Sequence, residues 1–119
     1  MIKILVVDDE AHIRLLYSEE LKDEGYEVIT AESGEGLLEL INRENPSLVV
    51  LDIKMTSHNG LDLLQDIRNQ YYDLPVILST AYDSFKEDMK SMAANDYVIK
   101  SFDLSELKSR IKKNLETAR

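Results

Sequence analysis

Acidic side chains follow two apolar runs of this 119-residue chain, and their placement favours metal-assisted phosphoryl chemistry. Asp52 ends one run, and the triplet Asp8, Asp9 and Glu10 directly follows a run near the N-terminus. Carboxylates gathered in one pocket repel one another unless a cation joins them. The sequence therefore predicts a magnesium site beside a nucleophilic aspartate, Asp52.

Three further polar side chains follow later apolar runs. Ser79 and Thr80 come after the fourth run, and Lys100 comes after the fifth. In an open parallel sheet, ligands bind outside the carboxyl ends of the strands, and these ends share one edge. A carboxylate nucleophile, a divalent cation, a hydroxyl and an ammonium group are what phosphoryl transfer to an aspartate requires.

Each of these residues alone has an ordinary structural explanation. Asp9 precedes a predicted helix and would usually be its N-cap. A single lysine after a strand is usually a solvated surface charge, and Ser79 with Thr80 would be turn residues. Asp52 differs because the next predicted helix begins several residues later. The combination at four strand ends, rather than any single residue, favours the functional interpretation.

Apolar runs alternate with segments of helical period along the whole chain, which predicts five strands and five helices. The predicted strands are 2–7, 26–31, 48–51, 75–78 and 97–99. The predicted helices are about 10–24, a segment from a Ser33 cap to Asn45, a segment from an Asn59 cap through Ile67, about 84–94, and a final segment from Asp103 to Leu115. Right-handed crossovers between such strands make an α/β doubly wound sheet, and residues 1–119 are predicted to form one domain.

Composition narrows the classes of partner. The net charge of −9 argues against direct nucleic-acid binding, because phosphate contacts need a basic surface. The chain has no cysteine, which excludes disulfides and thiolate sites and suits a cytoplasmic location. No apolar stretch approaches the roughly 20 residues that span a membrane. A protein partner or a metal-phosphate ligand is favoured.

Four motifs lie at the ends of the predicted strands. They are ILVVDDE at 4–10, LDIKM at 51–55 with Gly60 eight residues after Asp52, STA at 79–81 and YVIKSF at 97–102. Together they resemble the receiver domain of bacterial two-component response regulators. The resemblance covers nearly the whole chain. It implies the flavodoxin-like receiver fold, with a five-stranded parallel sheet of order 2-1-3-4-5.

The resemblance also implies roles for the acidic residues. Asp52 matches the aspartate that accepts a phosphoryl group from a histidine kinase or phosphotransfer protein. Asp9 matches the direct ligand of Mg²⁺ (or Mn²⁺), and Asp8 its neighbour that acts through water. The backbone carbonyl of Lys54 matches a further ligand, beside Asp52 itself. The implied protein is a signalling module that phosphorylates itself from a donor and slowly loses the phosphate, rather than an enzyme acting on substrates.

Other matched positions concern switching and docking. Thr80 resembles the switch hydroxyl that closes on the phosphoryl group, and Lys100 the lysine that pairs with it. Tyr97 stands where the family keeps an aromatic side chain that turns inward on activation. Ile13 matches a kinase-docking position, although a core residue of an amphipathic helix is an equal alternative. A downstream effector domain or protein is implied, and dimerisation on phosphorylation is left open.

One position departs from the family pattern. Receivers commonly have a cis proline after the active-site lysine, whereas this chain has Ser101. A cis bond before a non-proline residue costs about 2.5–4 kcal/mol. The Lys100–Ser101 bond is therefore predicted to be either trans, which would re-aim Lys100, or a strained cis bond.

Two alternative functions remain open from the sequence. A magnesium-dependent phosphohydrolase would use Asp52 as its nucleophile, but it needs a general acid and a lid, and neither is identified. A degenerate receiver would bind partners without being phosphorylated. The intact acidic cluster and Thr80 count against this second alternative.

Overall fold

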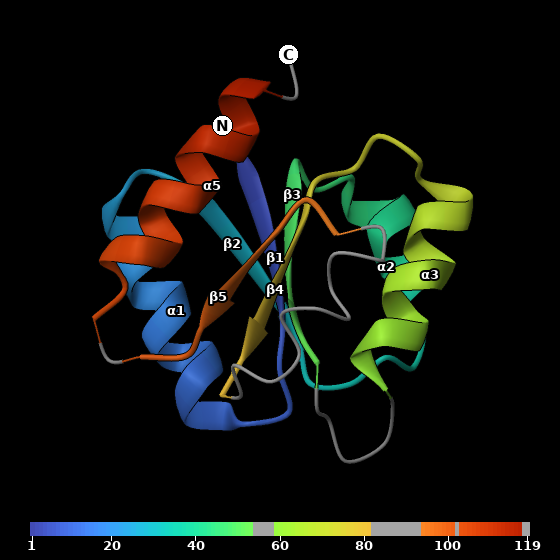
Figure 1. The fold of residues 1–119 in the computed structure, drawn as a ribbon, viewed down its shortest axis with the longest axis horizontal. Coiled ribbons are helices and arrows are strands. Elements are labelled where there is room, and N and C mark those ends of the chain that lie inside the picture. The colour runs from blue at the N-terminus through green and yellow to red at the C-terminus, as the bar shows by residue number, and fades with distance from the viewer. Residues whose placement is uncertain (54–58, 82–93, 102, 118–119) are drawn as a thin grey trace.

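The computed structural model describes residues 1–53, 59–81, 94–101 and 103–117. Five strands, all parallel, form one sheet of order β2-β1-β3-β4-β5 (Figure 1). Their bounds are β1 Lys3–Val7, β2 Glu27–Ala31, β3 Leu48–Asp52, β4 Val76–Thr80 and β5 Asp96–Ile99. The predicted doubly wound sheet and its strand order are confirmed, and the more polar β2 lies at an edge.

Helices cover both faces of this sheet. In the described residues they are α1 Ala11–Asp23, α2 Leu37–Glu44, α3 Gly60–Gln70 and α5 Ser105–Thr117. Figure 1 shows α1 and α5 on one face and α2 and α3 on the other. Five helices were predicted, and the one predicted at about 84–94 falls, except for Ala94, outside the described residues. Within the described chain, no helix is long and apolar enough to cross a membrane.

Two apolar clusters, one on each face, hold the helices to the sheet. The first joins α2 and α3 to side chains such as Leu5, Leu51 and Leu78. The second joins α1 and α5 to Ile4, Val6, Val50, Ile77 and Val98. Successive strand residues therefore feed opposite faces, because side chains alternate along a strand. Burial of both faces explains why the central strands β1, β3 and β4 contain continuous apolar runs.

Local signals set most helix ends as predicted. Gly25 follows α1 in the left-handed region at φ 94°, and its N–H donates to the carbonyl of Lys22 at 2.9 Å. Tyr26 N–H also donates to Leu21 O, which completes a Schellman motif. Asn59 Oδ1 accepts from Leu61 N–H at 2.8 Å and caps α3.

Ser33 does not cap α2, so that prediction is wrong. Its hydroxyl accepts from Glu35 N–H at 3.2 Å, within the turn that precedes the helix. Gly36 then lies in the left-handed region at φ 68°, and α2 begins only at Leu37. A left-handed residue interrupts right-handed helical geometry, so the helix starts after the glycine.

Gly60 brings the start of α3 against the end of β3. Its N–H donates to Ile53 O at 2.7 Å. A Cβ added at Gly60 would press on Asp52 O and would lie 2.5 Å from Ile53 Cα and 2.8 Å from Ile53 O. These neighbours are backbone atoms that cannot rotate away. Only glycine lets the start of α3 approach the end of β3 this closely, and this close packing helps to hold Asp52 in place.

Replacing Gly60 with alanine is expected to lower the free energy of unfolding by about 1–3 kcal/mol, the usual cost of overpacking. Urea unfolding followed by circular dichroism measures this change. The matched control is Asn69→Ala at an exposed position of the same helix, which should stay within about 0.5 kcal/mol of wild type. Equal stability of the two variants would contradict the close packing inferred for Gly60.

Candidate functional site

Three consecutive acidic residues follow β1 at the carboxyl edge of the sheet. Asp8 is buried, Asp9 is partly buried and Glu10 is exposed. One carboxylate oxygen from each can lie within 4.8 Å of the other two. Asp8 Oδ1 also accepts from Glu10 N–H at 2.9 Å, which fixes the buried carboxylate against the backbone.

Asp52 is the last residue of β3, and its side chain is buried. The register of β3 and β4 places it opposite Ser79, and Ile53 N–H donates to Ser79 O at 3.3 Å. Asp52 is therefore held by the sheet on one side and by the close approach of Gly60 on the other.

Lys100 joins the acidic groups from the other half of the sheet. Its Nζ lies 2.8 Å from Asp8 Oδ2, 3.3 Å from Asp52 Oδ2 and 3.4 Å from Glu10 Oε1. Burial lowers the pKa of Lys100, but the hydrogen bond to Asp8 and the charges of Asp52, Asp8 and Glu10 outweigh it. The net result is a pKa raised above the ordinary value for lysine, so the ammonium stays charged.

The bond from Lys100 to Ser101 is trans, since the described residues contain no cis peptide bond. A trans bond was expected to re-aim Lys100, yet its Nζ reaches both Asp8 and Asp52. The backbone explains this placement, because Lys100 N–H donates to Thr80 O at 2.7 Å and continues the pairing of β4 with β5. The side chain is therefore aimed by the sheet.

Three other predicted site residues lie on β4, β5 and α1. Thr80 is buried at the end of β4, and Tyr97 packs against the cluster of α2 and α3 on that face of the sheet. Ile13 is partly buried against the cluster of α1 and α5. Lys54, the predicted carbonyl ligand, lies outside the described residues.

Two contributors were not singled out from the sequence. Arg14 donates through Nη1 to the carbonyl of Asp8 at 2.8 Å, tying α1 to the end of β1. Tyr17 hydroxyl lies 3.2 Å from Ser79 Oγ, and both groups are buried. Burial raises the pKa of Tyr17, while Ser79 and the charge of Lys100 oppose that rise. Arg14 and Tyr17 are three apart and so share a helical face, a weak sequence signal for their inward direction.

The donor set at this edge fits magnesium. Mg²⁺ prefers carboxylate and carbonyl oxygens and is usually held by one or two carboxylates plus waters. Asp8, Asp9 and Glu10 supply carboxylate oxygens that lie close together. The buried Asp52 carboxylate lies near them, because Lys100 Nζ contacts both Asp8 and Asp52. All of these donors are oxygen atoms, which are the ligands that a hard divalent cation such as Mg²⁺ prefers.

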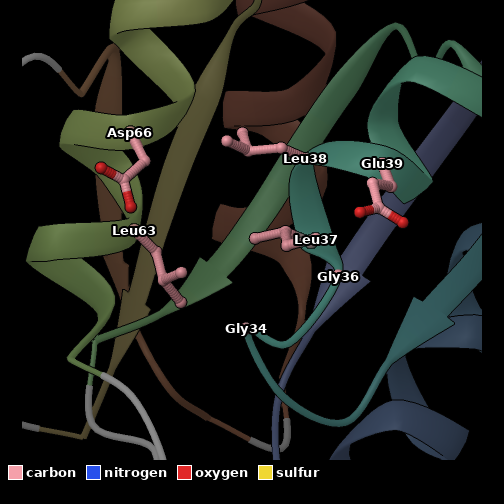
Figure 2. A pocket seen from close by; sticks show the side chains of 7 residues that line it. All are labelled: Gly34, Gly36, Leu37, Leu38, Glu39, Leu63 and Asp66. Carbon is pink, nitrogen blue, oxygen red and sulfur yellow. The ribbon is translucent and has the colours of Figure 1, made fainter.

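A pocket of about 300 Å³ lies elsewhere, between α2 and α3 (Figure 2). Leu37 and Leu38 extend from α2 towards α3, and Leu63 and Asp66 line the pocket from α3. None of the acidic or basic residues of the strand-end cluster lines this pocket. The chemistry is therefore assigned to the strand ends and not to this hollow.

Comparison with known proteins identifies the family. The response regulator receiver domain model matches residues 4–112, so the chain belongs to this family of two-component signalling modules. The curated protein described as probable transcriptional regulator ycf27 of Porphyra purpurea is 43% identical over 118 residues. That alignment covers 98% of this chain and 48% of the relative, so the chain spans about half the length of the curated relatives it matches.

Solved structures agree with this assignment. The response regulator TrrA of Thermotoga maritima in complex with Mg²⁺-BeF is 48% identical, with a TM-score of 0.90 over 96% of this chain and 99% of that chain. A second structure, of the histidine kinase ThkA in complex with TrrA, matches at 50% identity and a TM-score of 0.88. That match covers 97% of this chain and 99% of the matched chain.

Replacing Lys100 with methionine is expected to lower the free energy of unfolding by about 3 kcal/mol in metal-free buffer, because buried carboxylates lose their counter-ion. Mg²⁺ should restore more stability to this variant than it adds to wild type, since the cation replaces the missing charge. Urea unfolding with EDTA and then with Mg²⁺ measures both effects.

The matched control is Lys108→Met, which removes another lysine paired with two acids. Lys108 Nζ lies 2.8 Å from Glu20 Oε1 and 4.0 Å from Glu24 Oε2, but its side chain is 26% exposed against 12% for Lys100. A partly exposed pair contributes at most about 1 kcal/mol. A loss at Lys100 no larger than the loss at Lys108 would contradict the role of Lys100 as the buried counter-ion.

Proposed function

We propose that Asp52 accepts a phosphoryl group from a histidine kinase or phosphotransfer protein. The observation that carries this proposal is the buried Asp52 carboxylate, 3.3 Å from the ammonium of Lys100 and at the same edge as the acidic triplet. The relative TrrA, crystallised with Mg²⁺-BeF and separately with the histidine kinase ThkA, supports it.

The transfer is a nucleophilic substitution at phosphorus. An Asp52 carboxylate oxygen attacks, the bond from phosphorus to the donor atom breaks, and its electron pair leaves with the donor. Lys100 neutralises the negative charge that gathers on the transferring oxygens. Asp9 directly, Asp8 through water, Asp52 and the carbonyl of Lys54 would hold Mg²⁺, with Mn²⁺ as a substitute. When bound, this ion offsets the charge of the acids and of the phosphoryl group.

Thr80 and Tyr97 are proposed to report the phosphorylation. Strand alternation places both on the face of the sheet opposite Ser79, and β4 and β5 pair Leu78 with Tyr97 and Thr80 with Ile99. New phosphoryl oxygens on Asp52 are strong hydrogen-bond acceptors. A Thr80 hydroxyl drawn towards them would leave space that Tyr97 fills, changing the surface formed by β4 and β5.

Residues 1–119 are proposed to act as one receiver domain in the cytoplasm. Its output would pass to a downstream effector domain or protein, which the twofold length of the curated relatives supports. The acidic net charge favours protein partners over direct contact with nucleic acid. Ile13 is proposed to contribute to kinase docking through its partly exposed edge, and a dimer formed on phosphorylation is compatible with this scheme.

Replacing Asp52 with asparagine is expected to reduce phosphate uptake from a small phosphodonor with Mg²⁺ to background, since the amide is not a nucleophile. Mass spectrometry of the intact protein measures the added phosphoryl mass. The matched control is Asp66→Asn on α3, an exposed aspartate that should leave uptake unchanged. Undiminished uptake by the Asp52 variant would refute the proposed acceptor.

The same preparation separates signalling from hydrolysis. A receiver takes up one phosphoryl group from the donor and releases it slowly, whereas a phosphohydrolase turns over phosphate esters repeatedly. Sustained turnover of a phosphate monoester that depends on Asp52 and Mg²⁺ would favour the enzymatic alternative. Absence of uptake with intact folding would favour a receiver that acts by binding alone.

Replacing Thr80 with alanine is expected to preserve phosphate uptake but to weaken the structural response. Amide chemical shifts of residues 96–100 should change on phosphorylation in wild type, and by less than half as much in the Thr80→Ala variant. Thr80→Ser keeps the hydroxyl and is the matched control. Equal shift changes in the alanine and wild-type proteins would refute the switch role of Thr80.

A further inference from the structure

Two buried hydroxyls meet beneath the acidic cluster. Tyr17 from α1 and Ser79 from β4 are each 2% exposed, and their oxygens lie 3.2 Å apart across 62 residues of sequence. The surrounding cluster of α1, α5 and the sheet is otherwise apolar, with neighbours such as Ile77 and Val98. A buried hydroxyl without a partner is costly, so each of these two groups constrains the other.

The sheet places Ser79 beside the proposed phosphoacceptor. The register pairs Ser79 with Asp52, and residues paired across adjacent strands send their side chains to the same face, with strands about 4.8 Å apart. Val50 and Ile77, two residues earlier on the same strands, both belong to the cluster of α1 and α5. The Ser79 hydroxyl therefore lies next to Asp52, on the face from which Tyr17 approaches.

The geometry allows either hydroxyl to donate in the contact between Tyr17 and Ser79. Burial is the main influence on Tyr17 and raises its pKa, so the phenol keeps its proton at neutral pH. A serine hydroxyl has one proton to donate and two positions to accept. When Tyr17 donates to Ser79, the serine proton is free to turn to a third oxygen. Asp52, which as a carboxylate only accepts, is the register partner of that serine.

We propose that Ser79, oriented by the positioning residue Tyr17, donates a hydrogen bond to the Asp52 carboxyl group and thereby shortens the lifetime of the aspartyl phosphate. This inference rests on the proposed function of Asp52. The carboxyl oxygens of an acyl phosphate carry no formal charge and accept a hydrogen bond weakly, whereas a departing carboxylate accepts it strongly, because charge-assisted bonds are about twice as strong as neutral ones. The donor therefore acts most when the carboxylate leaves.

The step that Ser79 assists is hydrolysis. A water oxygen attacks phosphorus, the bond between phosphorus and the Asp52 oxygen breaks, and the electron pair returns to Asp52 as a carboxylate. Both water protons leave on dihydrogen phosphate, so atoms and charge balance. Ser79 donates to the carboxylate oxygen as its negative charge develops, and it transfers no proton.

The test measures the half-life of phosphorylated protein after the phosphodonor is removed, in buffer with Mg²⁺. Ser79→Ala is expected to lengthen the half-life by about tenfold, the usual scale for one hydrogen bond to a charged group. Tyr17→Phe should lengthen it by about threefold or more, through loss of orientation. The double variant should decay no more slowly than Ser79→Ala, because both changes act through one hydroxyl.

Two controls separate this role from a purely structural one. Ser79→Thr keeps a hydroxyl and should decay within about twofold of wild type, while Tyr26→Phe changes a half-buried tyrosine at the end of α1 and should have no effect. Urea unfolding reports the stability of each variant alongside. An unchanged or shortened half-life in Ser79→Ala would overturn the proposal, and so would additive effects in the double variant. Failure of wild type to take up phosphate would instead refute the proposed function.

Discussion

The electrostatic constraint at the carboxyl edge of the sheet shapes the rest of this structure. Asp8 and Asp52 are buried, and Lys100 lies between them with its Nζ 2.8 Å and 3.3 Å from their oxygens. Two buried carboxylates so close together would repel each other without this positive charge. Lys100 comes from β5, while Asp8 follows β1, and β3 and β4 lie between them. The strands β1, β3, β4 and β5 must therefore assemble before the acids gain their counter-ion.

The alternation of side chains along parallel strands divides the site into two functional faces. One face is that of α1 and α5, where the strands place Val6, Val50, Ile77 and Val98. The residues two positions further along the same strands are Asp8, Asp52, Ser79 and Lys100, so they belong to this face. Tyr97 packs on the face of α2 and α3, and Thr80 follows the same alternation. Under the proposed function, the groups that bind the phosphoryl charge and those that report it are separated by the thickness of the sheet. A single hydroxyl at the end of β4 can then connect the two faces.

Local sequence rules predicted the features that depend on neighbouring residues. Continuous apolar runs gave the buried strands, Gly25 gave the end of α1, and Asn59 gave the cap of α3. The prediction that Ser33 caps α2 was wrong, because Gly36 lies in the left-handed region and the helix begins only after it. The candidate residues at the strand ends also followed from their order along the chain. The contact between Tyr17 and Ser79 did not, because register and helix packing bring together hydroxyls that are 62 residues apart.

The position of Lys100 is set by pairing within the sheet and does not require a cis proline after it. The family commonly aims this lysine with a cis proline, and here Ser101 follows instead with a trans bond. The hydrogen bond from Lys100 N–H to Thr80 O extends the pairing of β4 and β5 by one residue and carries the lysine to the acids. The accepting carbonyl belongs to Thr80, the proposed switch residue. A movement of the Thr80 backbone would therefore also displace the backbone of Lys100. Under the proposed function, this hydrogen bond joins Lys100, which would compensate the phosphoryl charge, to Thr80, which would respond to it.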